Sequence, residues 1–326
     1  MNTMNTNTNT NTNMIDITGR LQNRRMPRGS IVALITPFNE DSSVNYDRIR
    51  ELVEWHIANG TDGIVALGTT GETPVLNDEE RDQIVRTIIE ASAGRIPVIV
   101  GSGCNNTAES REQSIRYEAM GADALLVITP YYNRTNKTGM IRHFTEIADA
   151  VSIPIILYNV PGRTGCPLTY EAVEALSHHP NIVGVKEASG DISLVSKIAR
   201  LITDDFVLYS GNDDMIVPLL SVGGAGVISV FANILPRETH RMVEAFHAGD
   251  LETAREIQLR YLDFINALFI ETNPIPIKEA MNAVGMNVGG YRLPLYPMEE
   301  NTRAHLLRTM EEVGFVLNGT ISETAK

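Results

Sequence analysis

The chain has 326 residues, of which 43% are hydrophobic and 21% charged, and its formal net charge at pH 7 is −13. This is the composition of a soluble globular protein, long enough for one large domain or two ordinary ones. The acidic balance argues against nucleic acid or an anionic membrane as a partner, because neither attracts an acidic surface, and no stretch approaches the roughly 20 apolar residues of a spanning helix. Any anionic substrate must therefore be held by local cations.

Residues 1–28 predict a low-complexity tail. Residues 1–13 are an Asn/Thr repeat without the apolar segment of a secretory signal, so we expect disorder here. A basic stretch follows, which we interpret as part of the same solvated tail and not as a binding arm. Its arginines are Arg20, Arg24, Arg25 and Arg28.

The cysteines and histidines show no metal or disulfide pattern. Cys104 and Cys166 are the two cysteines, which fits a reducing cytoplasm, and we expect both to be free. The seven histidines include no HxH or HExxH pair. We therefore predict a cytoplasmic protein with no metal and no cofactor; there is also no P-loop and no GxSxG elbow.

From Ser30 onward one unit repeats: a short apolar run, a loop and an amphipathic stretch of helical period. Several runs, such as Ala124–Ile128, are continuously apolar, as expected for parallel strands covered by helices. The eight predicted strands are Ile31–Thr36, Gly63–Leu67, Pro97–Val100, Ala124–Ile128, Ile153–Tyr158, Ile182–Val185, Phe206–Tyr209 and Gly226–Val230.

The helices between the strands have recognisable starts. Asn77 can cap the helix that carries the apolar stripe 84–89, and Glu80 stands where a capping box requires it. Similar candidate caps open later helices; they are Thr107, Thr169 and Asp191.

Eight such units without a Rossmann glycine fingerprint favour an α/β fold of the closed (β/α)₈ barrel type over an open doubly wound sheet. We expect the barrel to span residues 29–249. Residues 250–326 predict a C-terminal helical region that covers the barrel or supports assembly, with helices over Leu251–Phe269, from Asn273 onward and over Asn301–Gly314.

Lys186 is the first functional clue. Its flanking residues Ile182, Val183 and Val185 predict a buried strand, where an ammonium group is out of place. A lysine in an apolar pocket loses hydration of its charged form, so its pKa falls and the free amine can form a Schiff base with a carbonyl. The alternative is a lysine that reaches solvent or pairs with Glu187, and this stretch alone leaves both interpretations open.

Other polar residues follow neighbouring strands, at the end where barrel enzymes gather their chemistry. Each has a structural explanation: Thr69 and Thr70 can form a glycine-flanked turn, Tyr158 can be a core tyrosine, and Arg163 can make a loop ion pair. Their joint placement beside Lys186 favours a functional site. The segments are Gly68–Glu72, Thr129–Arg134, Tyr158–Gly165 and Ser210–Gly211.

Five motifs together resemble the dihydrodipicolinate synthase family, from about Gly29 to the end of the helical region. They are GTTGE at 68–72, TPYYNR at 129–134, YNVPGRTG at 158–165, GVKEASG at 184–190 and GVISV at 226–230. The resemblance implies a class I, Schiff-base lyase that condenses pyruvate with aspartate 4-semialdehyde in the diaminopimelate route to lysine. It also implies a homo-oligomer, a dimer or a tetramer.

The resemblance further implies a role for each catalytic residue. Lys186 forms the imine with pyruvate, and Tyr158 transfers protons to and from the bound intermediate. Thr69 and Tyr132 complete a hydroxyl relay with Tyr158, in which the tyrosine at the Tyr132 position is supplied by a neighbouring subunit. Hydroxyls within hydrogen-bond reach are what such a relay needs.

Substrate-binding roles follow in the same way. Thr70 and the backbone of Ile228 would hold the pyruvate carboxylate, and Gly211 would leave room beside it. Arg163 would hold the carboxylate of the second substrate, a task that suits its planar fork.

Two alternatives to this function remain. N-acetylneuraminate lyase and 2-keto-3-deoxy sugar acid aldolases share the lysine, the tyrosine and the glycine-flanked hydroxyls; Arg163 and Thr70 are the features that favour the synthase. A catalytically inactive pyruvate-binding barrel is the second alternative, against which the retention of Lys186, Tyr158, Thr69 and Tyr132 argues.

The family's lysine feedback site is only partly matched. Asn105, Glu109 and Tyr131 match lysine-binding residues of inhibited members, whereas two positions that are histidine in some of these are Asp78 and Arg81. We expect weak or no sensitivity to lysine.

Overall fold

The structure is a computed structural model that describes residues 26–317. The predicted disorder of residues 1–25 therefore concerns positions outside the described residues. Residues 26–28, which we expected in the tail, are described, and Met26 packs against the apolar cluster inside the barrel.

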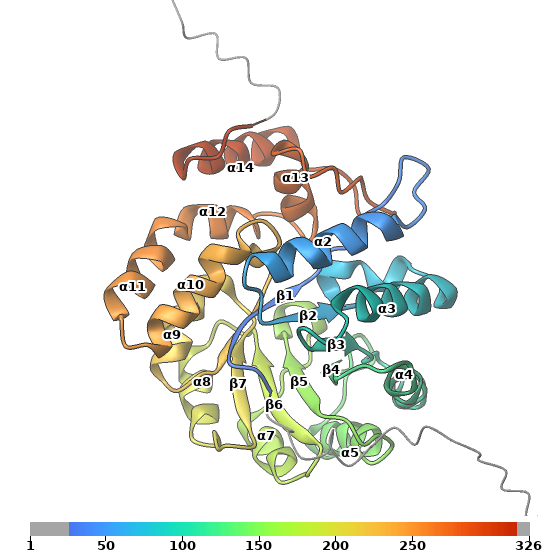
Figure 1. Cartoon of the computed structure of the whole chain (residues 1–326). Helices are drawn as coiled ribbons and strands as arrows, with labels where there is room; N and C mark the ends of the chain where they lie inside the picture. Colours follow the sequence, from blue (N-terminus) through green and yellow to red (C-terminus); the bar gives the residue numbers. More distant parts are fainter. Residues whose placement is uncertain (1–25, 318–326) are drawn as a thin grey trace, which may run out of the picture.

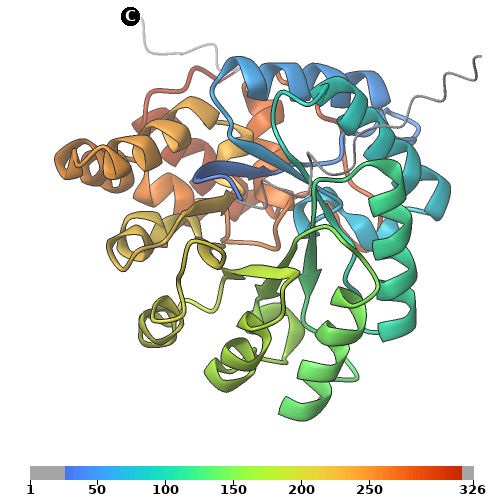
Figure 2. The same cartoon turned by 60° about the horizontal axis from the view of Figure 1, so that its bottom comes forward.

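The predicted (β/α)₈ barrel is confirmed. Within residues 26–317, eight parallel strands pair in chain order and close through pairing of the first with the last (Figure 1). Figure 2 shows the strands encircled by helices. The strands are β1 (Gly29–Ala33), β2 (Gly63–Ala66), β3 (Val98–Gly101), β4 (Ala124–Ile128), β5 (Ile155–Asn159), β6 (Ile182–Glu187), β7 (Val207–Ser210) and β8 (Gly226–Ser229).

Helices follow the strands as the repeating pattern predicts. Short 3₁₀ turns lie at the strand ends: η1 (Thr69–Gly71), η2 (Thr73–Val75), η3 (Asp213–Met215) and η4 (Phe231–Asn233). The barrel helices are α2 (Tyr46–Ala58), α3 (Asp78–Ser92), α4 (Thr107–Met120), α5 (Lys137–Ala148), α6 (Pro161–Thr164), α7 (Tyr170–Ser177), α8 (Ile192–Ala199), α9 (Ile216–Ser221) and α10 (Pro236–His247).

Three of the four predicted helix caps are confirmed. Asn77 and Glu80 form the capping box of α3, Thr169 caps α7 and Asp191 caps α8. The prediction for Thr107 is wrong. Asn106 caps α4 by accepting from the second and third backbone N–H groups, while the Thr107 hydroxyl bonds to a histidine ring 2.9 Å away.

The core has two apolar layers, one between the strands and the helices and one inside the barrel. The inner layer is built from alternate residues of the strands, among them Ile31, Ile99, Ile156 and Ile228. It fills the barrel with side chains, so that polar groups have room only at its ends.

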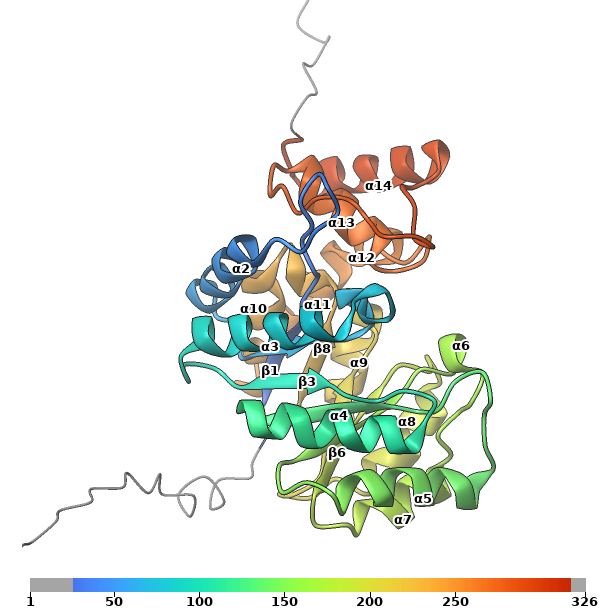
Figure 3. The ribbon, with the colours of Figure 1, turned by 90° about the vertical axis from the view of Figure 1, so that its right-hand side faces the viewer.

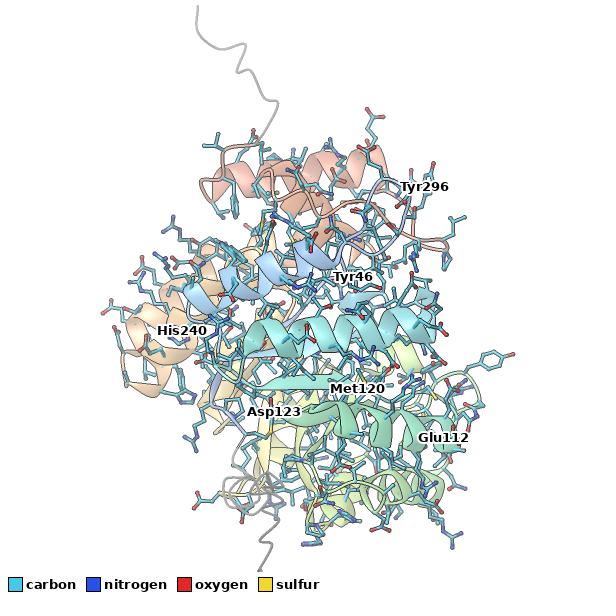
Figure 4. All side chains as sticks on the ribbon, turned by 45° about the vertical axis from the view of Figure 1, so that its right-hand side comes forward. Tyr46, Glu112, Met120, Asp123, His240 and Tyr296 are labelled. Carbon is cyan, nitrogen blue, oxygen red and sulfur yellow. The ribbon has the colours of Figure 1, made fainter. Side chains whose placement is uncertain are left out.

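The C-terminal residues form α11 (Leu251–Arg260), α12 (Leu262–Ala267), α13 (Ile275–Ala283) and α14 (Glu300–Glu312). The helix expected over Leu251–Phe269 is thus interrupted at Tyr261, which closes α11 and opens α12. Figure 3 shows α12 to α14 beside the barrel, and Tyr296 in Figure 4 marks the exposed loop that leads to α14. In residues 26–317, the structure contains no helix long and apolar enough to cross a membrane.

Candidate active site

The candidate site lies at the carboxyl ends of the strands. In Figure 3 the arrow of β3 points toward the edge where α6 lies, and α6 directly follows β5. The turn η1 follows β2 at the same end. Parallel strands therefore deliver the predicted hydroxyls, the arginine and the lysine to one face.

Lys186 lies within β6, one residue before the end of the strand, in register with Tyr158 on β5 and Tyr209 on β7. Both tyrosines belong to the inner layer, so Lys186 faces the barrel interior and only 5% of its surface is exposed. Glu187 is not its partner, because this carboxylate accepts hydrogen bonds from Asn159 and from the backbone of Ser189. The solvent-exposed and Glu187-paired interpretations of Lys186 are therefore excluded.

Burial lowers the pKa of Lys186 from 10.5 to about 8. The negative charge of Asp213 opposes this fall, and the positive charge of Arg163 adds to it. At neutral to mildly alkaline pH, a substantial fraction of the side chain is thus the neutral amine, which is the nucleophilic form.

Tyr158 is an acid–base neighbour of this amine. The Lys186 nitrogen lies 4.3 Å from the centroid of the Tyr158 ring. Burial raises the pKa of Tyr158, while the charge of Arg163 and a hydrogen bond with Thr69 oppose the rise. The site therefore pairs a neutral amine with a phenol that keeps its proton.

Thr69 stands on a loop with strained ends. Leu67 and Glu72, which flank Gly68–Gly71, both have left-handed backbones, with φ of 54° and 56°. Such a conformation costs a non-glycine residue roughly 1–2 kcal/mol. The loop also needs Gly101, since a Cβ there would meet the Leu67 carbonyl oxygen at 2.2 Å.

Gly211 lies next to the Lys186 side chain, and Ile228 lies in the barrel interior. A Cβ on Gly211 would lie 3.0 Å from Cε of Lys186, so a larger residue would press on the amine-bearing chain. Ile228 is fully buried in β8 and pairs with Ile31. A Cβ at position 211 would also lie 2.7 Å from Cβ of Ala188, so this position is crowded for any residue larger than glycine.

Thr70 and Arg163 are joined by a residue that the sequence did not single out. The Asn273 side-chain amide donates to the Thr70 hydroxyl at 3.0 Å, and the Arg163 guanidinium donates to the Asn273 carbonyl at 3.0 Å. Asn273 is 5% exposed, and its side-chain oxygen is buried without a hydrogen-bond partner. It stands just before α13, so the C-terminal helices contribute directly to this face.

A cavity of about 300 Å³ collects several of these residues. Thr69, Tyr158 and Arg163 line it together with Glu109 and Tyr131. Arg81, one of the two positions that depart from the lysine-binding pattern, lines it as well. Thr69, Tyr158 and Arg163 therefore border the same space as Glu109 and Tyr131 of the candidate regulatory site.

Six of the predicted site residues do not line this cavity; they are Lys186, Thr70, Gly211, Ile228, Tyr132 and Asn105. Tyr132 is 91% exposed and has a left-handed backbone with φ of 66°. Asn105 does not line the cavity, although its carbonyl accepts a hydrogen bond from Asn133 at 2.9 Å. One copy of the chain therefore does not bring Tyr132 to Thr69 and Tyr158.

Asp213 is a second residue that sequence reasoning missed. It is 1% exposed, and one carboxylate oxygen accepts from the backbone N–H groups of Val230 and Phe231 at 3.0 and 2.9 Å. Its charge acts on Lys186. The only feature of the sequence that could have indicated Asp213 is its position two residues after Gly211. Its burial and its hydrogen bonds to distant residues produce no pattern in the nearby sequence.

Comparison with known proteins gives consistent matches. Residues 26–313 match the model of the dihydrodipicolinate synthetase family. The chain is 52% identical over 290 residues to 4-hydroxy-tetrahydrodipicolinate synthase of Thermoanaerobacter sp. strain X514, covering 89% of this chain and 97% of the relative. It is 50% identical over 291 residues to the synthase of Clostridium perfringens strain SM101, covering 89% and 100%.

The solved structures agree. The chloride-inhibited dihydrodipicolinate synthase from Acinetobacter baumannii, complexed with pyruvate, superposes with a TM-score of 0.87 at 40% identity. The match covers 89% of this chain and 100% of that one.

Proposed function

Because the chain belongs to the dihydrodipicolinate synthetase family, we propose that it condenses pyruvate with L-aspartate 4-semialdehyde, the reaction of 4-hydroxy-tetrahydrodipicolinate synthase in the diaminopimelate route to lysine. The observation that carries the proposal is a buried Lys186, with its pKa lowered to about 8, beside the Tyr158 phenol. The pyruvate in the Acinetobacter relative supports the first substrate.

In this reaction the Lys186 amine attacks the pyruvate carbonyl, and the adduct loses water to form a protonated imine. Loss of a proton from the pyruvate methyl group gives an enamine, whose carbon attacks the aldehyde carbon of the second substrate. Each step either delivers or removes one proton close to Lys186. Tyr158, hydrogen-bonded to Thr69, is placed to carry those protons.

The relay is completed by Tyr132 of a second copy of the chain. A tyrosine that is 91% exposed on a strained backbone fits a residue that is covered by a partner. The active enzyme is then a homo-oligomer, a dimer or a tetramer, and works in the cytoplasm.

Carboxylate recognition divides between two groups. The Thr70 hydroxyl and the backbone at Ile228 hold the pyruvate carboxylate, and Gly211, which has no side chain, leaves room beside it. Arg163 binds the carboxylate of the semialdehyde; its guanidinium already lies at the cavity wall. This arginine separates the proposal from a sugar acid lyase, whose substrate has no carboxylate on the acceptor aldehyde.

The test is product formation from pyruvate and aspartate 4-semialdehyde, coupled to the following reductase. Cleavage of N-acetylneuraminate and of 2-keto-3-deoxygluconate is measured alongside. Turnover with the semialdehyde alone is the expected result. Sugar acid cleavage without it would keep the Lys186 imine but move the enzyme to the lyase branch. Reversible pyruvate binding with no borohydride-reducible adduct on Lys186 would favour a binding protein.

A further inference from the structure

Beneath the Gly68–Gly71 loop lies an ion pair for which the chemistry above has no use. Glu72 and Lys278 join at 2.7 Å, and both side chains are 0% exposed. Neither residue lines the cavity that holds Thr69 and Tyr158. Because both side chains are sealed from solvent, a substrate that enters from solvent does not reach the pair.

The two partners belong to different elements of the fold. Glu72 is the left-handed residue that ends η1, and its backbone N–H donates to the Thr69 carbonyl at 3.1 Å. Lys278 lies on α13 and also donates to the Thr36 carbonyl at 3.0 Å. The Thr36 hydroxyl in turn donates to the Gly71 carbonyl at 2.7 Å, which closes a chain of contacts around the loop.

The environment of Lys278 leaves its ammonium group little freedom. Its nitrogen lies 4.3 Å from the Phe38 ring centroid and 5.3 Å from that of Tyr291. A buried ion pair is a poor source of stability, because desolvation of the two charges offsets their attraction. Such a pair can instead fix the conformation of the residues that carry it. Here one of them, Glu72, has a left-handed backbone, and a strained conformation of this kind persists only where the surrounding structure supports it.

The contacts of Thr69 and Thr70 depend on the conformation of this loop. Thr69 is hydrogen-bonded to Tyr158, and Thr70 accepts from Asn273, which precedes α13. A small rotation of η1 would separate Thr69 from Tyr158 and turn the Thr70 hydroxyl. Displacements of about 1 Å at a reacting site can lower rates roughly a hundredfold.

We propose that Glu72 and Lys278 are positioning residues: their buried ion pair holds the strained loop so that Thr69 and Thr70 face the Lys186 imine. The proposal rests on the proposed Schiff-base function. It makes α13 part of the active-site framework and not only a cover for the barrel.

The test uses the full-length chain with the double substitution E72Q/K278M, which removes both buried charges together. Because no charge is left unpaired, we expect a midpoint of thermal unfolding close to that of the unaltered chain. The first readout is the rate at which pyruvate forms a borohydride-reducible adduct on Lys186, and the second is kcat with the semialdehyde. We expect both rates to fall about tenfold or more.

The matched control is E279Q/R303M. Glu279 on α13 is the residue next to Lys278, and it pairs with Arg303 on α14 at 2.6 Å. This ion pair does not contact the Gly68–Gly71 loop. The adduct rate of this control should stay within about twofold of the unaltered chain, because this partly exposed pair contributes little to the fold and lies away from the loop. Thr36→Val is a second test variant. Valine has the shape of threonine and adds no charge, so the substitution removes only the hydrogen bond from the Thr36 hydroxyl to the Gly71 carbonyl. It should slow adduct formation by about threefold or more.

The outcomes separate this proposal from the proposed function. If E72Q/K278M and T36V both form the pyruvate adduct as fast as the unaltered chain, the positioning role is wrong and the proposed function still stands. If E72Q/K278M does not fold, T36V decides alone. If the unaltered chain forms the adduct but never turns over the semialdehyde, the proposed function fails, while slower adduct formation in the variants still supports the positioning pair.

Discussion

Lys186 and Tyr158 face each other across β5 and β6, with the lysine nitrogen 4.3 Å from the centroid of the tyrosine ring. Unperturbed, the phenol with a pKa of 10.0 would lose its proton before the ammonium with a pKa of 10.5. Burial reverses this order, because it raises the pKa of Tyr158 and lowers that of Lys186 to about 8. Near pH 8 a nucleophilic amine therefore coexists with a phenol that can still donate a proton.

This reversal predicts the pH dependence of imine formation. The rate at which pyruvate is trapped on Lys186 by borohydride should rise with pH and have its midpoint at about 8, since the amine is nucleophilic only after it loses its proton. Tyr158→Phe should lower the rate throughout, because the proton donor is gone. A midpoint near the ordinary lysine value would contradict the burial of this amine.

Lys186→Met should abolish trapping and stabilise the fold. The depressed pKa is a cost of burying the charged form, and that cost is fully present below about pH 8 and disappears as the pH rises toward 10.5. At pH 7 we expect the free energy of unfolding to rise by about 1–3 kcal/mol, less than the full shift because Asp213 loses its partner charge. Denaturant unfolding at pH 7 and at pH 10 measures the gain and its decrease.

The control for this variant is K197M, at an exposed lysine on α8. It should change the free energy of unfolding by less than about 0.5 kcal/mol at either pH. An equal gain in both variants would mean that loss of positive charge in general, and not relief of burial at Lys186, stabilises the chain.

Arg163→Ala should affect two separate measurements. The Michaelis constant for the semialdehyde should rise by about tenfold or more, because a charged carboxylate partner is lost. The midpoint of pyruvate trapping should also move to higher pH, since the charge of Arg163 helps to lower the pKa of Lys186. Arg163→Lys should keep the midpoint but not the Michaelis constant. If the alanine variant has an unchanged Michaelis constant, the acceptor-binding role is wrong.

Lysine should bind weakly or not at all. Glu109 and Tyr131 line the cavity as lysine-binding residues would, but Arg81 lines it too and brings a positive charge toward the ligand's ammonium groups. Arg81 is held there by Asp78 at 3.3 Å and by the Thr73 carbonyl. Isothermal titration of the pyruvate-loaded enzyme should show no tight site, and tight binding would overturn this expectation.

Local sequence patterns predicted most of the barrel, because buried strands and capped helices leave periodic traces over a few residues. The strand ends were less accurate. The first predicted strand extended to Thr36, yet β1 ends at Ala33. Leu34 still donates to the Val65 carbonyl, and the residues after it are buried as loop. Lys186 likewise lies inside β6 and not beyond it, which apolar residues alone did not indicate.

The site could be predicted only where a motif names its residues. Asn273 bonds Thr70 across 203 positions, and Lys278 meets Glu72 across 206. Such contacts have no period and no fixed spacing, and the segment around Asn273 shows only a helix start to local analysis. Asp213 was missed for the same reason, because its backbone partners lie on the next strand-end turn.

The contact between Thr70 and Asn273 also sets the order of events during synthesis. A ribosome adds about 5–20 residues each second, so Asn273 and Lys278 emerge about 10–40 seconds after the loop that they hold. In the later part of that interval, after Lys186 has been added, the nascent chain can carry the reactive lysine and most of the barrel, but not the residues that fix Thr70 and Glu72. Catalytic competence is therefore acquired late, when the last helices have been translated.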